Sequence, residues 1–181
     1  MLKQEAIFLS QLLSGVTKKK VLNIGSMTIP KLRLYQPWCL EYVLEPLKKR
    51  KNKIYNLDME KGEGVDIVAD CQDMRQVIRD GYFEVVLFLN TLEHLLRPDQ
   101  ALVEIYRVLA VGGSCFASVP AFDYPYHEDP LDTLLRLSNL EDWRRYFTRE
   151  KWAIVNFKLV TDSRLQPPRL DQVTIIKAIK K

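Results

Sequence analysis

The feature that most constrains the fold is the segment 82–89, in which Val, Leu and Phe follow one another almost without interruption. A strand with one face in water alternates apolar and polar residues, whereas a strand covered on both faces is apolar nearly throughout. Sheets covered on both faces by helices have mostly parallel strands. Residues 82–89 therefore predict a central strand of a mostly parallel sheet.

Strand and helix patterns alternate along the rest of the chain. Apolar residues at helical spacing predict helices over 2–14, 38–50, 72–79 and 131–147, and a further helix from Pro98 to the pair Gly112-Gly113. Pro46 predicts a kink or an early end in the second of these helices. Short apolar runs predict six more strands, over 21–24, 54–57, 67–69, 114–119, 152–160 and 172–180.

The order of these elements predicts the fold class. Alternating strands and helices are typical of an α/β fold with a doubly wound, mostly parallel sheet, here of seven strands. The last two strands have no helix between them and are joined by a Pro-Pro loop, which predicts an antiparallel hairpin at the C-terminal end. A chain of 181 residues suits one domain, so we expect residues 1–181 to form a single unit.

Composition and cysteine usage narrow the class of protein further. The hydrophobic fraction of 47% and the charged fraction of 28% are those of an ordinary globular protein. No apolar run approaches the roughly 18 residues that a membrane span needs. Cys39, Cys71 and Cys115 are odd in number and far apart, which indicates neither a disulfide framework nor a metal site. We therefore expect a cytoplasmic protein without a bound metal and without a membrane partner.

The charge pattern gives little indication of a polyanionic partner. The formal charge is +4, and the basic clusters at 18–20, 48–53 and 144–145 are short and separated in sequence. Such clusters are common at solvated loops and at helix C-termini, where the helix dipole favours cations. A nucleic-acid partner is compatible with this pattern but not indicated by it, and the oligomeric state is open.

Four predicted strands end on glycine or a polar residue: Gly25, Asp58, Asp70 and Asn90. In parallel sheets of this kind the ligand binds beyond the carboxyl ends of the strands, so these four residues mark a candidate site. A carboxylate at the end of the second strand can accept hydrogen bonds from both hydroxyls of a ribose, which makes Asp58 the ribose candidate. Glu45 has the more usual spacing from Gly25, but it lies inside a predicted helix.

Each of the two aspartates also has a purely structural interpretation. Aspartate is frequent at turns, so Asp58 can be a turn residue. Asp70 can equally be the N-cap of the helix predicted at 72–79.

The sequence resembles the methyltransferase type 11 group of class I S-adenosylmethionine-dependent methyltransferases. The segment FEVVLFLNTLEHLLRPDQALVEIYRVLAVGGSCFASVP, residues 83–120, is similar to the pattern FD-V-LEH-P-EI-RVL-PGG-P of that group. The similarity extends to VLNIGS at 21–26, to YNLDMEKGEGVDIVADCQD at 55–73 and to PYHEDPLDTLLR at 125–136. It implies a Rossmann-like methyltransferase fold and S-adenosylmethionine as cofactor.

The resemblance also implies a role for individual residues. The turn that contains Asn23, Gly25 and Ser26 corresponds to the glycine-rich loop under the methionine part of the cofactor. Asp58 corresponds to the acid that binds the ribose. Asp70 and the backbone of Cys71 correspond to the position that meets the adenine, and Asn90 to the residue beside the reactive sulfonium.

The glycine-rich loop departs from the family pattern. The usual G-x-G-x-G is replaced by Gly25-Ser26-Met27-Thr28-Ile29, which keeps only the first glycine. If residue 27 needs a positive φ, a methionine there costs free energy that a glycine would not. This loop motivates an alternative function, a binding or interaction protein that has the methyltransferase fold but no catalytic activity.

Methyl transfer needs no nucleophile from the protein, although an acceptor oxygen or nitrogen that loses a proton benefits from a general base. His127 and His94 are the candidates, and a structural role is at least as good an explanation for His94. The loop after the fifth strand is rich in aromatic and acidic residues and is expected to form the acceptor pocket. The substrate candidates there are Tyr124, Tyr126, Asp132 and Arg136. The acceptor is expected to be a small molecule, such as a sugar.

Overall fold

A computed structural model of the protein describes residues 1–121, 135–161 and 172–181. These residues form one seven-stranded sheet in the order β3-β2-β1-β4-β5-β7-β6, as the sequence predicts. Neighbouring strands from β3 to β5 pair in parallel, whereas β7 pairs antiparallel with both β5 and β6. The strands are β1 (Lys20–Ile24), β2 (Lys53–Asp58), β3 (Ile67–Val68), β4 (Phe83–Leu89), β5 (Leu109–Pro120), β6 (Trp152–Thr161) and β7 (Gln172–Lys180).

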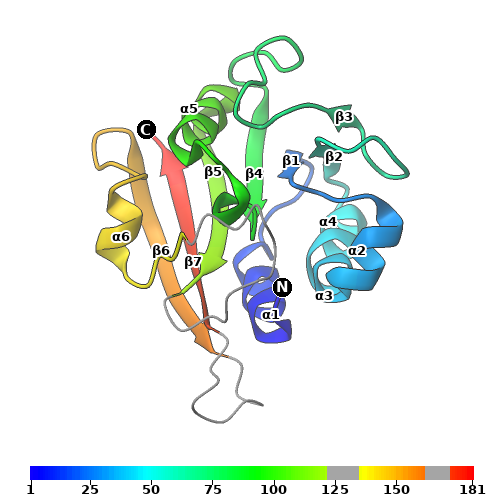
Figure 1. Ribbon diagram of the computed structural model, residues 1–181, viewed down its shortest axis with the longest axis horizontal. Coiled ribbons are helices and arrows are strands. Elements are labelled where there is room, and N and C mark those ends of the chain that lie inside the picture. Colours follow the sequence, from blue (N-terminus) through cyan, green and yellow to red (C-terminus); the bar gives the residue numbers. More distant parts are fainter. Residues whose placement is uncertain (122–134, 162–171) are drawn as a thin grey trace.

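Helices cover the two faces of this sheet. Helices α5 and α6 lie on one side, and α1 to α4 lie on the other (Figure 1). The bounds are α1 (Lys3–Leu12), α2 (Ile29–Tyr35), α3 (Pro37–Cys39), α4 (Glu45–Lys49), α5 (Pro98–Val108) and α6 (Leu140–Arg144). None of the helices within the described ranges is both long enough and apolar enough to cross a membrane.

The central strand β4 contributes to the hydrophobic cores on both faces of the sheet. Val86 and Phe88 pack under α5, while Val85 and Leu87 pack under α1 and the helices that follow β1. All four side chains are buried. This arrangement explains why the strand is apolar throughout, and it confirms the prediction of a central strand covered on both sides.

The helix predicted at 38–50 forms, and Pro46 does not end it early. The helical path runs from α3 through a π-helical turn, η1 (Leu40–Leu44), into α4. The N–H of Glu45 bonds to the carbonyl oxygen of Leu40, five residues back. A proline inside a helix lacks an N–H and collides with the preceding turn, and a wider turn directly before it removes both problems.

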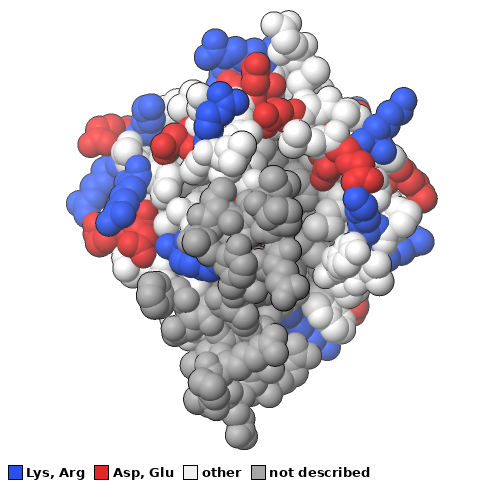
Figure 2. All heavy atoms as spheres, in the orientation of Figure 1, with Lys and Arg blue, Asp and Glu red and all other residues white. Residues whose placement is uncertain are grey.

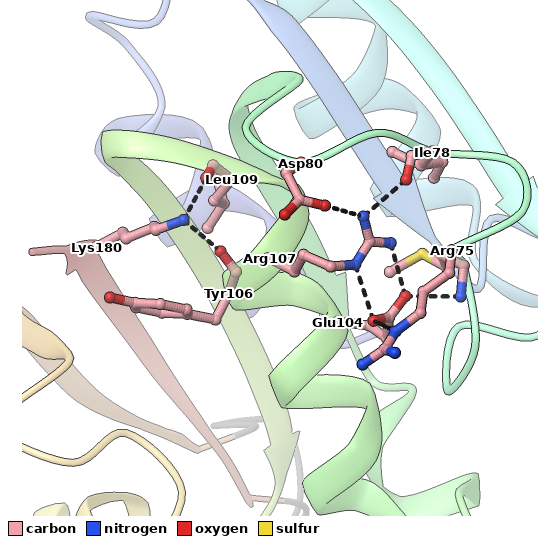
Figure 3. Close-up of polar contacts among 9 residues, drawn as sticks. Arg75, Ile78, Asp80, Glu104, Tyr106, Arg107, Leu109 and Lys180 are labelled. Atoms are coloured by element: carbon pink, nitrogen blue, oxygen red, sulfur yellow. Dashed lines mark hydrogen bonds and ion pairs between the residues drawn. The ribbon is translucent and has the colours of Figure 1, made fainter.

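The prediction of a helix at 72–79 was wrong, because these residues form turns. Two helix-like bonds remain, from the N–H groups of Val77 and Ile78 to the carbonyl of Met74 at 3.1 and 2.9 Å. The N–H of Met74 itself bonds to the buried Glu104 carboxylate of α5 at 2.8 Å (Figure 3). Contacts with α5 thus hold this segment, which forms turns in place of the predicted helix.

Two further boundaries differ from prediction. Helix α5 ends at Val108, and Gly112-Gly113 lies inside β5, where the β4–β5 pairing changes register. A Cβ at position 113 would lie 2.8 Å from the carbonyl oxygen of Ala110, so this irregular strand needs a glycine there. In the helix predicted at 131–147, residues 135–139 are not helical, and α6 begins only after the N-cap Asn139.

Candidate cofactor site

The carboxyl ends of β1, β2 and β4 meet at one rim of the sheet. Ile24 of β1 pairs with Leu57 of β2 and with Phe88 of β4, so the residues that follow these three lie side by side. The N–H groups of Gly25 and Ser26 both donate to the Leu57 carbonyl, at 2.9 and 3.1 Å. The fold therefore brings Gly25, Asp58 and Asn90 to one edge, as the strand-end argument predicts.

Asp58 connects β2 to the turn that follows β1. One carboxylate oxygen accepts the N–H of Met27 at 2.8 Å, and the other accepts the N–H of Glu60 at 3.0 Å. Two carboxylate oxygens offer about four acceptor positions, so these two bonds leave capacity for two more donors. The side chain is only partly buried. Asp58 thus suits the binding of a pair of hydroxyl groups such as those of a ribose.

The close packing of Thr91 requires a glycine at position 25. The φ of Gly25 is +68°, a left-handed conformation, and a Cβ at this position would lie 2.5 Å from Oγ1 of Thr91. Thr91 follows Asn90, and its hydroxyl donates to the Leu89 carbonyl at 3.1 Å. The absence of a side chain at Gly25 therefore lets the turn after β1 pack directly on the turn after β4.

The larger residues of the altered loop are accommodated by glycines in another segment. A Cβ at Gly64 would lie 2.3 Å from Cγ1 of Ile29, and one at Gly62 would lie 2.5 Å from Cγ2 of Thr28. The N–H of Ile29 also bonds to the carbonyl of Glu63 at 2.8 Å. The side chains of Thr28 and Ile29 are thus directed toward the 62–64 segment. The loop at 25–29 lacks two of the family's glycines, and Gly62 and Gly64 in the facing segment make room for its larger side chains.

Met27 has a left-handed backbone conformation, which glycine adopts most easily. Its φ is +60°, and its side chain packs against the core on the α1 side of the sheet. The sequence predicts a free-energy cost for methionine at position 27 if its φ is positive, and its φ is positive. That cost is of the order of 1 kcal/mol for a residue other than glycine, partly offset by this packing.

Asp70 and Cys71 lie just after β3 on the same side of the molecule. Asp70 accepts the N–H of Gln72 at 2.8 Å, and Gln72 in turn accepts the N–H of Arg97 before α5 at 2.8 Å. A hollow of about 530 Å³ borders Gln72 and Arg97. Cys71 is buried, and burial raises the pKa of its thiol to about 12, so the group stays protonated at neutral pH.

Sequence reasoning missed a contact between Asn90 and the first helix. Nδ2 of Asn90 donates to Oε1 of Glu5 at 2.9 Å, and the hydroxyl of Ser118 in β5 donates to the same oxygen at 2.7 Å. Glu5 is fully buried. The available signal was its place on the apolar stripe of the helix, between Leu2 and Leu9, where a charged residue needs polar partners.

The other predicted site residues lie as follows. Asn23 is buried within β1, and its side chain donates to Oδ1 of Asn56 at 3.0 Å rather than reaching the rim. His94 ends the short helix η2 (Leu92–His94), with Nε2 3.9 Å from the buried carboxylate of Glu93. Arg136 bonds to the carbonyl of Leu135 at 3.0 Å. Outside the described residues lie Tyr124, Tyr126, His127 and Asp132.

Comparison with known proteins agrees with this geometry. Residues 34–117 match the sequence family described as methyltransferase domain. No curated protein matches the sequence. The matched segment runs from the end of α2 to β5, so it includes Asp58, Asp70, Cys71 and Asn90.

Solved structures share the fold at low sequence identity. A 1,6-didemethyltoxoflavin-N1-methyltransferase from Burkholderia thailandensis, solved with 1,6-didemethyltoxoflavin and S-adenosylhomocysteine, is 15% identical with a TM-score of 0.69, over 98% of this chain and 79% of that one. A candidate methyltransferase from Bacillus halodurans is 12% identical with a TM-score of 0.67, over 97% and 98%. The cyclase SpnF is 15% identical with a TM-score of 0.67, over 98% and 80%.

These structures share with the chain a Rossmann-like sheet that ends in antiparallel strands. The chain therefore has the Rossmann-like methyltransferase fold, and its residues 34–117 match a methyltransferase domain.

Proposed function

We propose that the protein binds S-adenosylmethionine at the rim formed by β1, β2 and β4 and transfers its methyl group to a small-molecule acceptor. The observation that carries the proposal is Asp58. Its carboxylate lies at the end of β2, holds the turn after β1 through the Met27 N–H, and has acceptor capacity left for two hydroxyl groups.

Different residues of the rim would contact different parts of the cofactor. Asp58 would accept the ribose hydroxyls, Gly25 and Ser26 would lie along the methionine part, and Asp70 with Cys71 would border the adenine. Asn90 would lie beside the reacting centre. When bound, S-adenosylmethionine supplies the methyl group, and the electron pair of the broken carbon–sulfur bond stays on sulfur.

The residues of this chain would act mainly by positioning. Holding the acceptor atom in line with the methyl group replaces a collision in solution with a single oriented encounter. An acceptor hydroxyl or amine that loses a proton needs a base within hydrogen-bond reach, a role that we assign to His127. His94, next to a buried carboxylate, suits a structural role better. Tyr124, Tyr126, Asp132 and Arg136 would line the acceptor pocket.

A small acceptor is supported by two observations. The Burkholderia neighbour is named for methylation of a nitrogen in a small heterocycle. On the face of the molecule shown in Figure 2, basic and acidic side chains are interspersed over the described surface rather than gathered into one basic area. Binding of a polyanion relies on such basic areas. The acceptor that we propose is a small molecule, such as a sugar.

Calorimetric titration with S-adenosylmethionine and S-adenosylhomocysteine tests the proposal. We expect micromolar binding, about −8 kcal/mol, and at least a tenfold weaker affinity for Asp58→Asn, because a hydrogen bond to a charged group contributes about 1.5–3 kcal/mol. Asp66→Asn is the matched control. Asp66 also accepts a backbone N–H, that of Asn56 at 2.8 Å, but it precedes β3 instead of ending β2. Its replacement should leave the affinity unchanged.

A turnover screen after the titration separates the proposal from the inactive alternative. Two observations motivate that alternative: the left-handed Met27 and the naming of one neighbour as a cyclase. Binding followed by multiple-turnover methylation in a screen of hydroxylated and amino acceptors would establish the enzyme. Binding without turnover of any acceptor would favour a cofactor-binding protein, and a folded protein that binds neither compound would contradict the proposed site.

A further inference from the structure

Glu5 is a fully buried carboxylate that joins three parts of the fold. Oε1 accepts hydrogen bonds from Nδ2 of Asn90 at 2.9 Å and from the hydroxyl of Ser118 at 2.7 Å. Oε2 accepts the N–H of Leu2 at 3.1 Å, which caps α1. One side chain thus connects the first turn of α1 with the carboxyl ends of β4 and β5.

Burial of this carboxylate is costly unless its oxygens are well paired. Moving an ionised carboxylate out of water costs several kcal/mol, and the cost is recovered only through hydrogen bonds and favourable charge interactions. An alanine or leucine at position 5 would suit the apolar face of α1, which packs on the core through Ala6 and Leu9. The carboxylate is therefore not explained by the packing of the helix alone.

The contact fixes the orientation of the Asn90 amide. A carboxylate accepts hydrogen bonds but cannot donate one when ionised, so it can pair only with the NH₂ end of the amide. The carbonyl oxygen Oδ1 is then the end of Asn90 that the contact leaves unused. Asn90 also has a left-handed backbone, with φ of +48°, and its N–H bonds to the Ser118 carbonyl at 2.9 Å. The backbone of Asn90 is thus held by Ser118, and its side chain is held by Glu5.

This anchor reaches the turn after β1 through the next residue. Thr91 packs against Gly25 so closely that a Cβ there would lie 2.5 Å from its hydroxyl oxygen. A shift of the 90–91 turn would therefore move against Gly25, the residue that begins the proposed cofactor loop. Among the predicted cofactor residues Glu5 hydrogen-bonds to Asn90, and through Asn90 and Thr91 this contact supports two sides of the rim.

We propose that Glu5 is a positioning residue: from α1 it holds Asn90 with the amide oxygen Oδ1 presented to the bound ligand. This inference rests on the proposed function, because it assigns Asn90 to the cofactor and acceptor site. An oxygen in that position accepts hydrogen bonds, so it selects groups that carry N–H or O–H. It follows that helix α1 forms part of the site and does more than cover the sheet.

Two substitutions separate positioning from simple packing. In Glu5→Gln the amide oxygen can still accept from Asn90 and Ser118, while its NH₂ faces the N–H of Leu2, so the helix cap is lost and the contact with Asn90 is kept. In Glu5→Asp the charge is kept, but the side chain is one methylene shorter and should lose Asn90. Leu12→Ala is the control, since it weakens the packing of the same helix without a contact to Asn90.

The first measurement uses the ligand-free protein. The side-chain amide of Asn90, assigned in ¹H–¹⁵N spectra by its loss in Asn90→Ala, should show slow hydrogen exchange in the wild type. We expect slow exchange to persist in Glu5→Gln and Leu12→Ala and to become at least tenfold faster in Glu5→Asp and Glu5→Ala. Unchanged exchange in Glu5→Asp would overturn the inference, whether or not Glu5→Ala folds.

The second measurement is the dissociation constant of S-adenosylhomocysteine. We expect it to rise at least fivefold in Glu5→Asp and to stay within twofold of the wild type in Glu5→Gln and Leu12→Ala. An equal rise in Leu12→Ala would assign the effect to helix stability and contradict a positioning role. If the wild type binds no S-adenosylhomocysteine, the proposed function fails, whereas the exchange experiment still decides whether Glu5 orients Asn90.

Discussion

At the scale of single residues, the candidate site is marked by unusual backbone conformations. Among the described residues, four that are not glycine have a positive φ: Lys18, Met27, Lys51 and Asn90. Two of these, Met27 and Asn90, belong to the rim where β1, β2 and β4 end. Each costs of the order of 1 kcal/mol relative to a relaxed conformation. Both donate a hydrogen bond to a carboxylate of another element: the Met27 N–H to Asp58 and the Asn90 side-chain amide to Glu5.

A substitution at Gly25 tests how tightly the two turns pack. Gly25→Ala should destabilise the protein by more than the cost of a left-handed alanine, about 1–2 kcal/mol, because its Cβ also collides with Thr91. The double variant Gly25→Ala with Thr91→Ala should recover the part due to the collision. Urea unfolding of the two single variants and the double variant gives this coupling. Strictly additive effects would show that the contact does not govern the turn.

At the scale of elements, helix α5 holds the segment that follows β3. The Glu104 carboxylate, only 5% exposed, accepts the N–H of Met74 and two hydrogen bonds from Arg107, at 2.7 and 2.9 Å (Figure 3). Arg107 also donates to the Ile78 carbonyl at 2.8 Å and to Asp80 at 2.7 Å. These bonds replace the regular helix expected at 72–79, and they fix the segment that carries Asp70 and Cys71.

Removing one partner of this buried pair should be strongly destabilising. Arg107→Met leaves the Glu104 carboxylate with much less compensation, and we expect the free energy of unfolding to fall by about 3 kcal/mol. Arg75→Met is the comparison, since Arg75 is 71% exposed and lies 3.6 Å from the same carboxylate. Its loss should change stability by less than about 0.5 kcal/mol. Denaturant unfolding measures the free energy of unfolding of both variants. Equal losses in the two variants would mean that the 72–79 segment does not depend on Arg107.

At the scale of the whole molecule, groups with shifted pKa values set the pH range of stability. The pKa of Glu104 is lowered, mainly by its hydrogen bonds with Arg107, and that of Glu84 mainly by its hydrogen bond with Lys19. Burial raises the pKa of all three thiols, to about 12 for Cys39 and Cys71 and further for Cys115. The carboxyl groups therefore make the stability depend on pH at low pH, and the thiols do so at high pH.

The expected result is a stability plateau with two limbs. A lowered carboxyl pKa stabilises the fold above the unfolded value of about 4.3, and this contribution is lost as the pH falls through the folded value. A raised thiol pKa favours the fold below about pH 8.5, and each thiol then costs about 1.4 kcal/mol per pH unit as the pH rises further. Urea unfolding with reductant from pH 3 to 10 measures both limbs.

Two variants assign the limbs of this profile to residues. Glu104→Gln should flatten the acid limb, and Cys115→Ala should make the basic limb shallower by the contribution of one thiol. An acid limb that is the same in Glu104→Gln as in the wild type would show that this carboxyl does not contribute to the pH dependence.

The tertiary structure also brings together basic residues that are far apart in sequence. The N–H of Lys18 bonds to the carbonyl of Arg50, and the N–H of Lys53 bonds to that of Lys19. The clusters at 18–20 and 48–53 therefore adjoin at the amino ends of β1 and β2, at the opposite end of the strands from Gly25 and Asp58. Their separation in sequence gave no indication of this, because it depends on the pairing of two strands.

The sequence by itself determined the strands and the rim. Runs such as 82–89 specify buried strands through local apolar content, and in a parallel sheet the residues that end those strands must share one edge. Asp58 and Gly25 were found in this way. Local pattern did not predict the turns at 72–79, a segment that is held by Glu104 from 30 residues away.

Only the tertiary structure decided how the rim is supported. Glu5 and Asn90 are 85 residues apart, and the glycines that make room for Thr28 and Ile29 lie in a different segment. Such contacts depend on which side chains face one another after the sheet and helices have packed, and no local periodicity encodes that. The buried carboxylate of Glu5 interrupts the apolar stripe of α1, but its partners at the end of β4 and in β5 reach it only in the folded chain.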